Sequence, residues 1–192
     1  MAEGKIKADR CASWAADPSA NRECQVEWRP TTLYAACGCG PRAPLRSVDA
    51  ERFLAQMKGI ADTGFVVAFA SREDRHHEWA VDVAKGITEP LLTCEAVLAE
   101  SAFHLRSVAR VLSLVDDDML LLAFDCNRNL DRLAELADRY QDREPDFADL
   151  CLIRMSELFP RHTVITTDEN DFRVYRRNKR EPITLLCPPR AS

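Results

Sequence analysis

The chain has 192 residues, of which 46% are hydrophobic and 30% are charged, and its formal net charge is -5. This composition suffices for one domain with a buried core, and the acidic balance argues against a generally basic surface that coats nucleic acid, although it leaves room for a local basic patch. No apolar run approaches the roughly 20 residues of a membrane-spanning helix and no signal-peptide core is present, so we expect a cytoplasmic protein that does not engage a membrane.

Residues 1–56 differ in character from the rest of the chain. They show little sustained periodicity and hold half of the eight cysteines: Cys11, Cys24, Cys37 and Cys39. We interpret them as an N-terminal extension, either disordered or translated from a start codon placed too early, and we interpret residues 57–192 as the folded domain. The four cysteines could bind zinc, but their spacing does not favour it, and without an export signal we expect free thiols.

From residue 57 onward, short apolar segments alternate with amphipathic ones. The expected order is strand 59–62, helix 64–70, helix 75–86, strand 90–93, helix 94–113, an apolar run at 120–124, helix 129–140, helix 147–159, strand 164–167 and strand 183–187. In the longest helix, five apolar residues at helical spacing predict the core face: Leu98, Ala102, Leu105, Ala109 and Leu112. The alternation predicts an α/β sandwich around a largely parallel sheet flanked by helices.

Carboxylates occupy positions at which such a sheet places its chemistry. Asp62 and Asp168 each follow a predicted strand, and ligands of open parallel sheets bind at the carboxyl ends of the strands. Glu100 lies in the middle of the long helix, and Asp149 lies near the start of a later one. Both helices could direct a carboxylate toward the strand ends.

A cluster of carboxylates implies a cation, because the charges repel one another unless a metal ion stabilises them. Ligands that are all oxygens suit Mg²⁺ or Mn²⁺, which keep some of their waters and accept phosphate oxygens from a substrate. Such an ion can activate water for attack on phosphorus and stabilise the departing oxygen. The pattern therefore indicates phosphodiester hydrolysis.

Each carboxylate also has a purely structural interpretation. Asp62 and Asp168 could simply end their strands in polar turns. Asp149 could complete a helix cap that begins at Asp146, and Glu95 fits the first turn of its helix. Glu100, in the middle of a helix, has no such explanation.

The surroundings of these residues carry a resemblance to a known family. Four blocks occur in order: ADTGFVVAFASREDRHHEWA, LLTCEAVLAESAFHL, DFADLCLIRMSEL and HTVITTDENDFRVYRR. Together they resemble the PIN domain, and within it the VapC-type toxins of prokaryotic toxin–antitoxin pairs, over about residues 57–188. One departure is that Leu150 and Cys151 stand where relatives commonly carry small residues.

The resemblance implies a PIN-like three-layer sandwich and Mg²⁺- or Mn²⁺-dependent cleavage of RNA by an endoribonuclease. It assigns the catalytic and metal-binding positions to Asp62, Glu100, Asp149 and Asp168, with Asp171 as an auxiliary metal ligand. It also implies a homodimer and inhibition by a cognate antitoxin protein.

A basic run follows the last acidic block and includes Arg173, Arg176 and Arg177. It is either a solvated loop or a surface that holds the phosphates of RNA beside the metal centre. His76 and His77 lack the spacing of a zinc protease, and we expect them to face solvent at a helix start. Four cysteines beside apolar runs are expected to be small buried hydrophobes: Cys94, Cys126, Cys151 and Cys187.

Three other functions stay open from the sequence. The first is a non-catalytic PIN-like module that binds RNA or a partner, although the complete set of acids argues against it. The second is a stand-alone RNA-processing nuclease without an antitoxin. The third is a phospho-accepting receiver domain, which needs a lysine at the end of a later core strand; the lysines after residue 57 end none: Lys58, Lys85 and Lys179.

Overall fold

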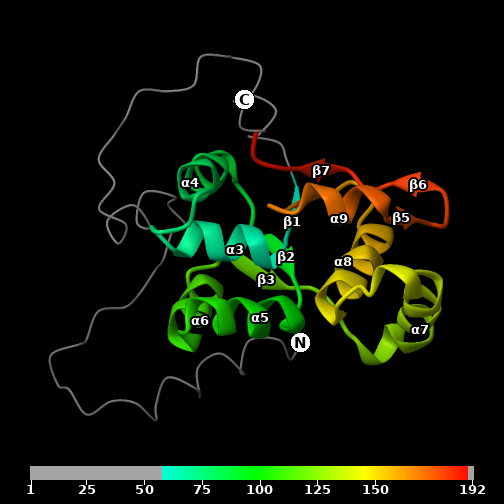
Figure 1. Cartoon of the computed structure of the whole chain (residues 1–192). Coiled ribbons are helices and arrows are strands. Elements are labelled where there is room, and N and C mark those ends of the chain that lie inside the picture. Colours follow the sequence, from blue (N-terminus) through cyan, green and yellow to red (C-terminus); the bar gives the residue numbers. More distant parts are fainter. Residues whose placement is uncertain (1–57, 190–192) are drawn as a thin grey trace, which may run out of the picture.

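A five-stranded parallel sheet lies at the centre of the structure, a computed structural model that describes residues 58–189 (Figure 1). The strands are β1 Gly59–Ala61, β2 Leu91–Thr93, β3 Leu120–Leu122, β4 Thr163–Ile165 and β7 Leu185–Leu186, in the spatial order β3-β2-β1-β4-β7. Every pairing within this sheet is parallel. The expected extension, residues 1–56, lies outside the described residues.

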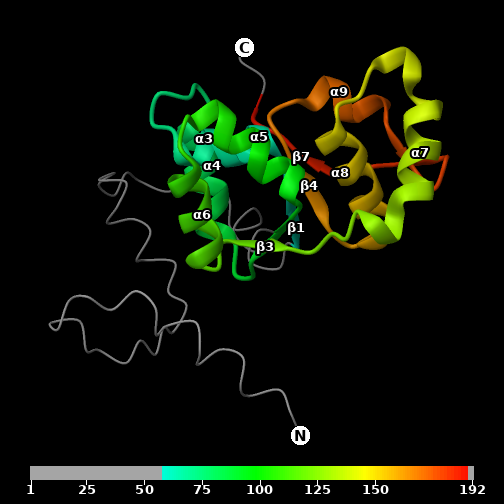
Figure 2. The same cartoon turned by 90° about the horizontal axis from the view of Figure 1, so that it is seen from below.

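Helices cover both faces of the sheet. In the described residues they are α3 Thr63–Ala70, α4 His77–Gly86, α5 Glu95–Leu105, α6 Val108–Asp116, α7 Leu130–Arg139, α8 Phe147–Leu158 and α9 Glu169–Val174, with short 3-10 turns at Asn127–Asn129 and Gln141–Arg143. Figures 1 and 2 show α3 to α6 on one side of the sheet and α7 and α8 on the other. This is the arrangement that right-handed crossovers give when the chain first builds β1, β2 and β3 outward and then returns to β4 and β7. The predicted α/β sandwich with a mainly parallel sheet is confirmed.

The centre of the sheet is closely packed. All residues of β1, β2 and β4 are buried, as expected for parallel strands covered on both faces. Gly59 opens β1 because there is no room for a side chain: a Cβ there would lie 2.5 Å from a methyl of Leu91 and 2.8 Å from one of Ile165. The sheet therefore holds β1 tightly between its two neighbours.

The predicted helix 94–113 is wrong in one respect, because the structure divides it into α5 and α6. Arg106 ends α5 with φ of 49°, and Ser107 begins α6 by accepting a hydrogen bond from the N–H of Arg110. The break rotates α6 relative to α5, so the buried residues are Val97 and Ser101 on α5 and Val111 and Leu114 on α6. The predicted core face is wrong too: Leu112 is 56% exposed.

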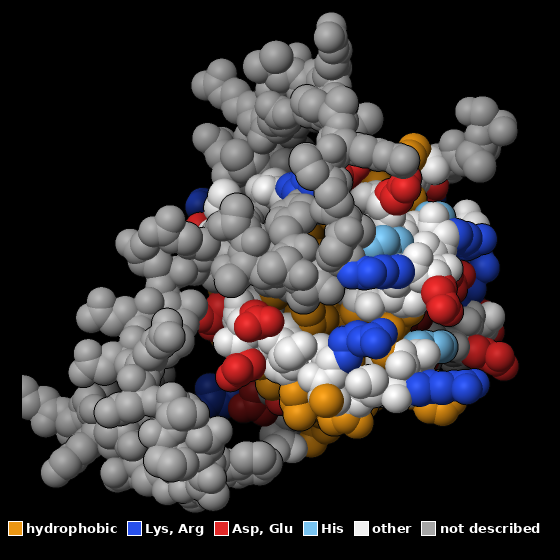
Figure 3. All heavy atoms as spheres, turned by 90° about the vertical axis from the view of Figure 1, so that its left-hand side faces the viewer, with side chains coloured by type: hydrophobic (Ala, Val, Ile, Leu, Met, Phe, Trp, Pro, Cys, Tyr) orange, Lys and Arg blue, Asp and Glu red, His pale blue; other side chains and the backbone are white. Residues whose placement is uncertain are grey.

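Three large apolar side chains face solvent on this helical hairpin. Phe103 is 79% exposed and Val108 63%, in addition to Leu112. Figure 3 shows hydrophobic side chains gathered at the lower edge of the face that carries α6. We call these three residues the α5–α6 apolar surface.

The position of His77 also differs from the expectation. It is 7% exposed rather than solvent-facing, because its Nδ1 lies 2.8 Å from the carbonyl oxygen of Ala68 and ties the start of α4 to α3. His76 is partly exposed. The four cysteines in the described region are free, as predicted; Cys94 and Cys151 are buried, whereas Cys126 and Cys187 are partly exposed.

A buried ion-pair network fastens α8 to its surroundings. The carboxylate of Glu157 is 1% exposed and accepts hydrogen bonds from Arg132 of α7, from Arg154 one turn earlier and from the backbone N–H of Asn178. Burial alone would raise the pKa of Glu157, but these donors lower it to about 2. The network fixes the helix that carries Asp149.

The end of the domain contains a second, small sheet. Strands β5 Arg176–Arg177 and β6 Glu181–Pro182 pair antiparallel around a turn in which Asn178 and Lys179 both have positive φ. The basic run of the sequence therefore begins at Arg173 in α9 and continues into a short hairpin. Within residues 58–189, no helix combines the length and the apolar character needed to cross a membrane.

Candidate active site

The sheet has one switch point, between β1 and β4. From β1 the chain moves outward to β2 and β3, and from β4 it moves the other way to β7. Ligands of open parallel sheets bind beside such a point, at the carboxyl ends of the strands. Since Ala61 pairs with Ile165 in the register, the residues that follow, Asp62 and Thr166, meet at this point.

Asp62 is held in one orientation by two short hydrogen bonds. Its Oδ1 accepts from the backbone N–H of Thr63 at 2.6 Å, and its Oδ2 accepts from the hydroxyl of Thr166 at 2.6 Å. The residue is 8% exposed, and burial raises the pKa of its carboxyl to about 6, opposed by the hydrogen bonds and reinforced by the negative charge of Glu100. Asp62 therefore caps the start of α3 and also belongs to the acidic cluster.

Glu100 approaches this point from α5. Its Oε2 accepts a hydrogen bond from the hydroxyl of Thr63 at 2.8 Å, so one threonine links it to Asp62. His104, one turn further along α5, lies 3.8 Å from the other carboxylate oxygen. Gly64 permits the close approach of α3 and β4 here, since a Cβ on it would lie 2.1 Å from Oγ1 of Thr167.

Asp149 enters from the opposite layer, in the first turn of α8. Its backbone N–H donates to the N-capping carboxylate of Asp146 at 2.7 Å, while its own Oδ2 accepts from the hydroxyl of Tyr175 at 3.2 Å. Burial, then the negative charges of Asp146 and Asp62, raise the pKa of Asp149 to about 7. The helix cap expected to begin at Asp146 is confirmed, and the carboxylate of Asp149 accepts from Tyr175 and lines the pocket.

Asp168 and Asp171 lie together at the start of α9. Asp168 caps this helix by accepting from the N–H of Asp171 at 3.1 Å, and its own N–H donates to the hydroxyl of Thr166 at 2.9 Å. Burial and the neighbouring charge of Asp168 raise the pKa of Asp171. Thr166 thus connects this pair to Asp62.

All five predicted acids line one pocket of about 290 Å³. Two further acids that sequence reasoning had not placed there, Asp74 and Asp146, line it too, as does His104. The spacing of His104 four residues after Glu100 was the only sequence signal for its place. No Lys or Arg is among the described residues that line this pocket, so its negative charge is not neutralised from within.

The donor set fits a hard divalent cation. The carboxyl groups of Asp62 and Asp149 are removed from water to different degrees, and burial together with neighbouring negative charges raises their pKa values, so a cation would favour their charged forms. In the described region, no three His, Cys, Asp or Glu side chains converge closely enough to hold a metal by themselves. Mg²⁺ is usually held by one or two carboxylates and keeps several waters, and carboxylates are the side chains that this pocket offers.

The three arginines predicted to bind RNA make contacts within the protein. Arg173 forms an ion pair with Glu169, and Arg177 binds Glu181 at 3.0 Å and the carbonyl of Pro160 at 2.8 Å. Arg176 donates to the carbonyls of Arg173 and Tyr175. The side chain of Arg173 is 59% exposed, whereas that of Arg177 is 16% exposed. Arg173 also lies two residues after the pocket residue Asp171.

The chain matches the model of a known protein family. The family model of the PIN domain matches residues 60–178. No curated protein matches the chain. The matched span contains all five predicted acids and the complete switch point.

Proposed function

Since the chain belongs to the PIN domain family, whose members are generally nucleases that use divalent metal ions, we propose that it is a metal-dependent endoribonuclease acting on RNA. We further propose that it is a VapC-type toxin of a toxin–antitoxin pair. The observation that carries the nuclease proposal is the convergence of acids from both helical layers on one pocket at the switch point. An acidic pocket can accept a polyanion only when cations neutralise it, which is the requirement of metal-dependent phosphodiester hydrolysis.

We assign the metal-binding role to Asp62, Glu100, Asp149 and Asp168, with Asp171 as an auxiliary. When bound, Mg²⁺ or Mn²⁺ supplies positive charge for the phosphate and promotes the ionisation of an attacking water. Hydrolysis then adds water across the phosphodiester and breaks one P–O bond.

The chain's own groups prepare this pocket by orienting the carboxylates. Thr63 donates its N–H to Asp62 and its hydroxyl to Glu100, while Thr166 donates to the other oxygen of Asp62. These bonds fix which oxygens remain free to face the pocket. Catalytic groups held in this way need little reorganisation when a ligand arrives.

We propose that Arg173, Arg176 and Arg177 contact the phosphates of RNA near the pocket. The exposure of Arg173 and its place beside Asp171 support a contact from that residue. The internal contacts of Arg176 and Arg177 instead support a role in holding the hairpin beside the end of α9, which carries Arg173.

We also propose two protein partners, a cognate antitoxin and a second copy of the chain. The α5–α6 apolar surface supports a protein partner, because large apolar side chains are seldom gathered on a surface that stays wet. Replacing Phe103 with Ser should shift the molar mass by light scattering if it belongs to the homodimer interface. If the mass is unchanged but antitoxin binding is lost, the surface belongs to the antitoxin.

The nuclease proposal is tested with the full chain and a mixed RNA pool, in the presence of Mg²⁺, Mn²⁺ or EDTA. We expect cleavage that requires metal and disappears in the Asp62→Asn and Asp149→Asn variants. The matched control is Asp116→Asn, which changes an exposed carboxylate at the end of α6 and should cleave normally.

The outcomes separate the alternative functions. A folded protein that binds Mn²⁺ by calorimetry but cleaves no RNA would favour the non-catalytic module. Metal-dependent cleavage without growth arrest on induced expression would favour a stand-alone RNA-processing nuclease over a toxin. Growth arrest that requires Asp62 would support the toxin.

A further inference from the structure

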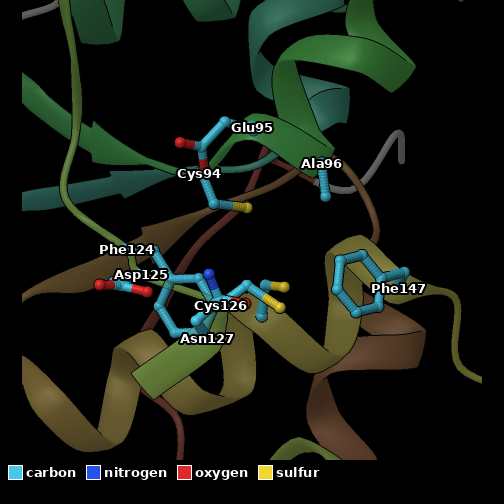
Figure 4. Close-up of a pocket in the computed structure, with 9 residues that line it drawn as sticks. Cys94, Glu95, Ala96, Phe124, Asp125, Cys126, Asn127 and Phe147 are labelled. Carbon is cyan, nitrogen blue, oxygen red and sulfur yellow. The ribbon is translucent and has the colours of Figure 1, made fainter. Parts of the chain in front are cut away.

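A second pocket, of about 500 Å³, lies between the start of α5, the segment after β3 and the start of α8 (Figure 4). It shares no lining residue with the carboxylate pocket, although α5 and α8 contribute to both. The hydrolysis proposed above does not use it. Its volume is typical of sites that bind small molecules, so it can accept part of a ligand that also occupies the carboxylate pocket.

The lining of this second pocket is partly apolar and partly polar. Three buried apolar residues line it: Cys94, Phe124 and Cys151. Three exposed polar residues line it too: Glu95, Asp125 and Asn127. Apolar walls with a few polar groups suit a flat heteroaromatic ring, which has apolar faces and a hydrogen-bonding edge.

Phe147 offers an aromatic face to this pocket. It is the first residue of α8, and it is 54% exposed although it lines the pocket. Figure 4 shows its ring across the hollow from Cys126 and Asn127. Unpaired nucleobases stack on such rings, and the stacking of one base changes affinity by about 5-fold to 100-fold.

The amide of Asn127 is available for the edge of a base. Asn129, two residues later, uses its amide within the protein: it donates to the carbonyl of Asp125 and accepts from Arg154, each at 2.8 Å. Among the residues that the structure describes, Asn127 has no such hydrogen bond. Its amide can therefore donate to a base and accept from it.

The charges around the pocket favour a base over a phosphate. Glu95 and Asp125 line it, and no Lys or Arg does among the described residues. The nearby Arg128 is paired with Asp125 at 3.2 Å. A phosphate would be repelled by these carboxylates, whereas a base is uncharged.

The two pockets are close enough for neighbouring nucleotides of one strand. Ala96 and Glu100, one from each pocket, are four residues apart on α5, which is a rise of about 6 Å. At the start of α8, Phe147 directly follows Asp146, which lines the carboxylate pocket. A phosphate at the carboxylates therefore leaves the base of an adjacent nucleotide within reach of the second pocket.

We propose that the second pocket binds one unstacked base of a single-stranded RNA whose phosphate lies at the carboxylates. Phe147 stacks on this base, and Asn127 forms a hydrogen bond with its edge. The inference rests on the proposed action on RNA. It adds recognition that the carboxylates cannot supply, because the phosphate is the same in every nucleotide.

The test compares the binding of two decamers to the full chain by fluorescence anisotropy. One is decaadenylate RNA, and the other is an abasic decamer with the same number of phosphates. Ca²⁺ replaces Mg²⁺ to neutralise the carboxylates, and a gel verifies that the decamers stay intact. We expect the wild type to bind decaadenylate about 5-fold or more tightly than the abasic decamer.

Substitutions of Phe147 assign this difference to the pocket. Phe147→Leu keeps an apolar side chain but removes the ring, so affinity for decaadenylate should fall by about 5-fold or more, while affinity for the abasic decamer stays the same. The slope of log Kd against log salt should not change, because no phosphate contact is lost. Phe147→Tyr keeps the ring and should bind like the wild type. The matched control is Leu158→Ala, which shortens an exposed side chain at the other end of α8 that lines neither pocket.

The outcomes distinguish this inference from the nuclease proposal. The inference is overturned if the wild type binds both decamers alike or binds neither. It is also overturned if Phe147→Leu binds decaadenylate as the wild type does; metal-dependent cleavage of RNA would still support the nuclease in each of these cases. Base-dependent binding that Phe147→Leu loses and Phe147→Tyr keeps, in a protein that cleaves no RNA, would support the base pocket and contradict the nuclease.

Discussion

Asp62→Asn should make the metal-free protein more stable near neutral pH while it abolishes the proposed cleavage. The pKa of Asp62 rises from 3.8 to about 6 in the folded chain. Each tenfold change in a protonation equilibrium is worth about 1.4 kcal/mol, so keeping this carboxyl ionised costs the metal-free fold about 3 kcal/mol. An amide has one acceptor oxygen where the carboxylate has two, so it cannot accept from both Thr63 and Thr166; the lost hydrogen bond takes back about 1 kcal/mol and leaves a gain of about 2 kcal/mol.

The sign of the pH dependence follows from the raised pKa. Because the folded chain holds the proton of Asp62 more tightly than the unfolded chain, the contribution of Asp62 to stability is full below about pH 4 and is lost as the pH rises through about 6. The Asp62→Asn variant has no carboxyl at this position, so it does not lose this stability as the pH rises. The difference between variant and wild type should therefore be small near pH 4 and largest at about pH 8.

The assay is urea unfolding followed by circular dichroism, in EDTA and in Mn²⁺. A ligand present at 100 times its Kd stabilises the folded state by about 2.7 kcal/mol, so Mn²⁺ should raise the stability of the wild type and change the variant little. Asp116→Asn, at an exposed site, should match the wild type in both conditions. An Asp62→Asn protein that is less stable than the wild type in EDTA at about pH 8 would refute the argument from burial and repulsion.

Three further predictions concern the residues around the pocket. Tyr175→Phe keeps the ring but removes the hydroxyl that donates to Asp149; we expect Mn²⁺ affinity by calorimetry to fall by about 10-fold or more, with an unchanged Tm in EDTA. Glu157→Gln removes the buried carboxylate that pairs with Arg132 and Arg154 and should lower the free energy of unfolding by about 3 kcal/mol or more, whereas Glu135→Gln removes an exposed carboxylate, leaves Arg132 paired with Glu157, and should cost less than about 1 kcal/mol in the same urea titration. Arg173→Ala should weaken RNA binding and reduce the slope of log Kd against log salt by about 0.7 if this residue contacts one phosphate, and an unchanged slope in fluorescence anisotropy would exclude the contact.

Much of the fold could be predicted because its signals are local. The strands near residues 59–62 and 90–93 are short apolar runs, and each helix from α3 to α8 follows an apolar periodicity. The break between α5 and α6 escaped because apolar spacing continues across it. Ser107 was a local signal for a new helix start, but the positive φ of Arg106 depends on how the two helices pack.

The candidate site, too, was predictable only in part. Asp62 and Asp168 were predictable from their places after strands, and the structure brings both to the pocket together with Glu100 and Asp149. The supporting residues were not predictable, because a contact such as that between Tyr175 and Asp149 joins segments with no shared pattern.

The central position of β1 also governs when the pocket can exist during synthesis of the chain. Thr166, which fixes Asp62, lies 104 residues later in the sequence, and β1 gains its neighbour β4 only after helices α3 to α8 have been made. Contacts of such separation form late, because the intervening chain must be ordered first. A ribosome that has translated the chain only as far as α5 therefore carries Asp62 and Glu100 without the partners that complete the pocket, and the assembled site appears only after β4 and the start of α9 have been made.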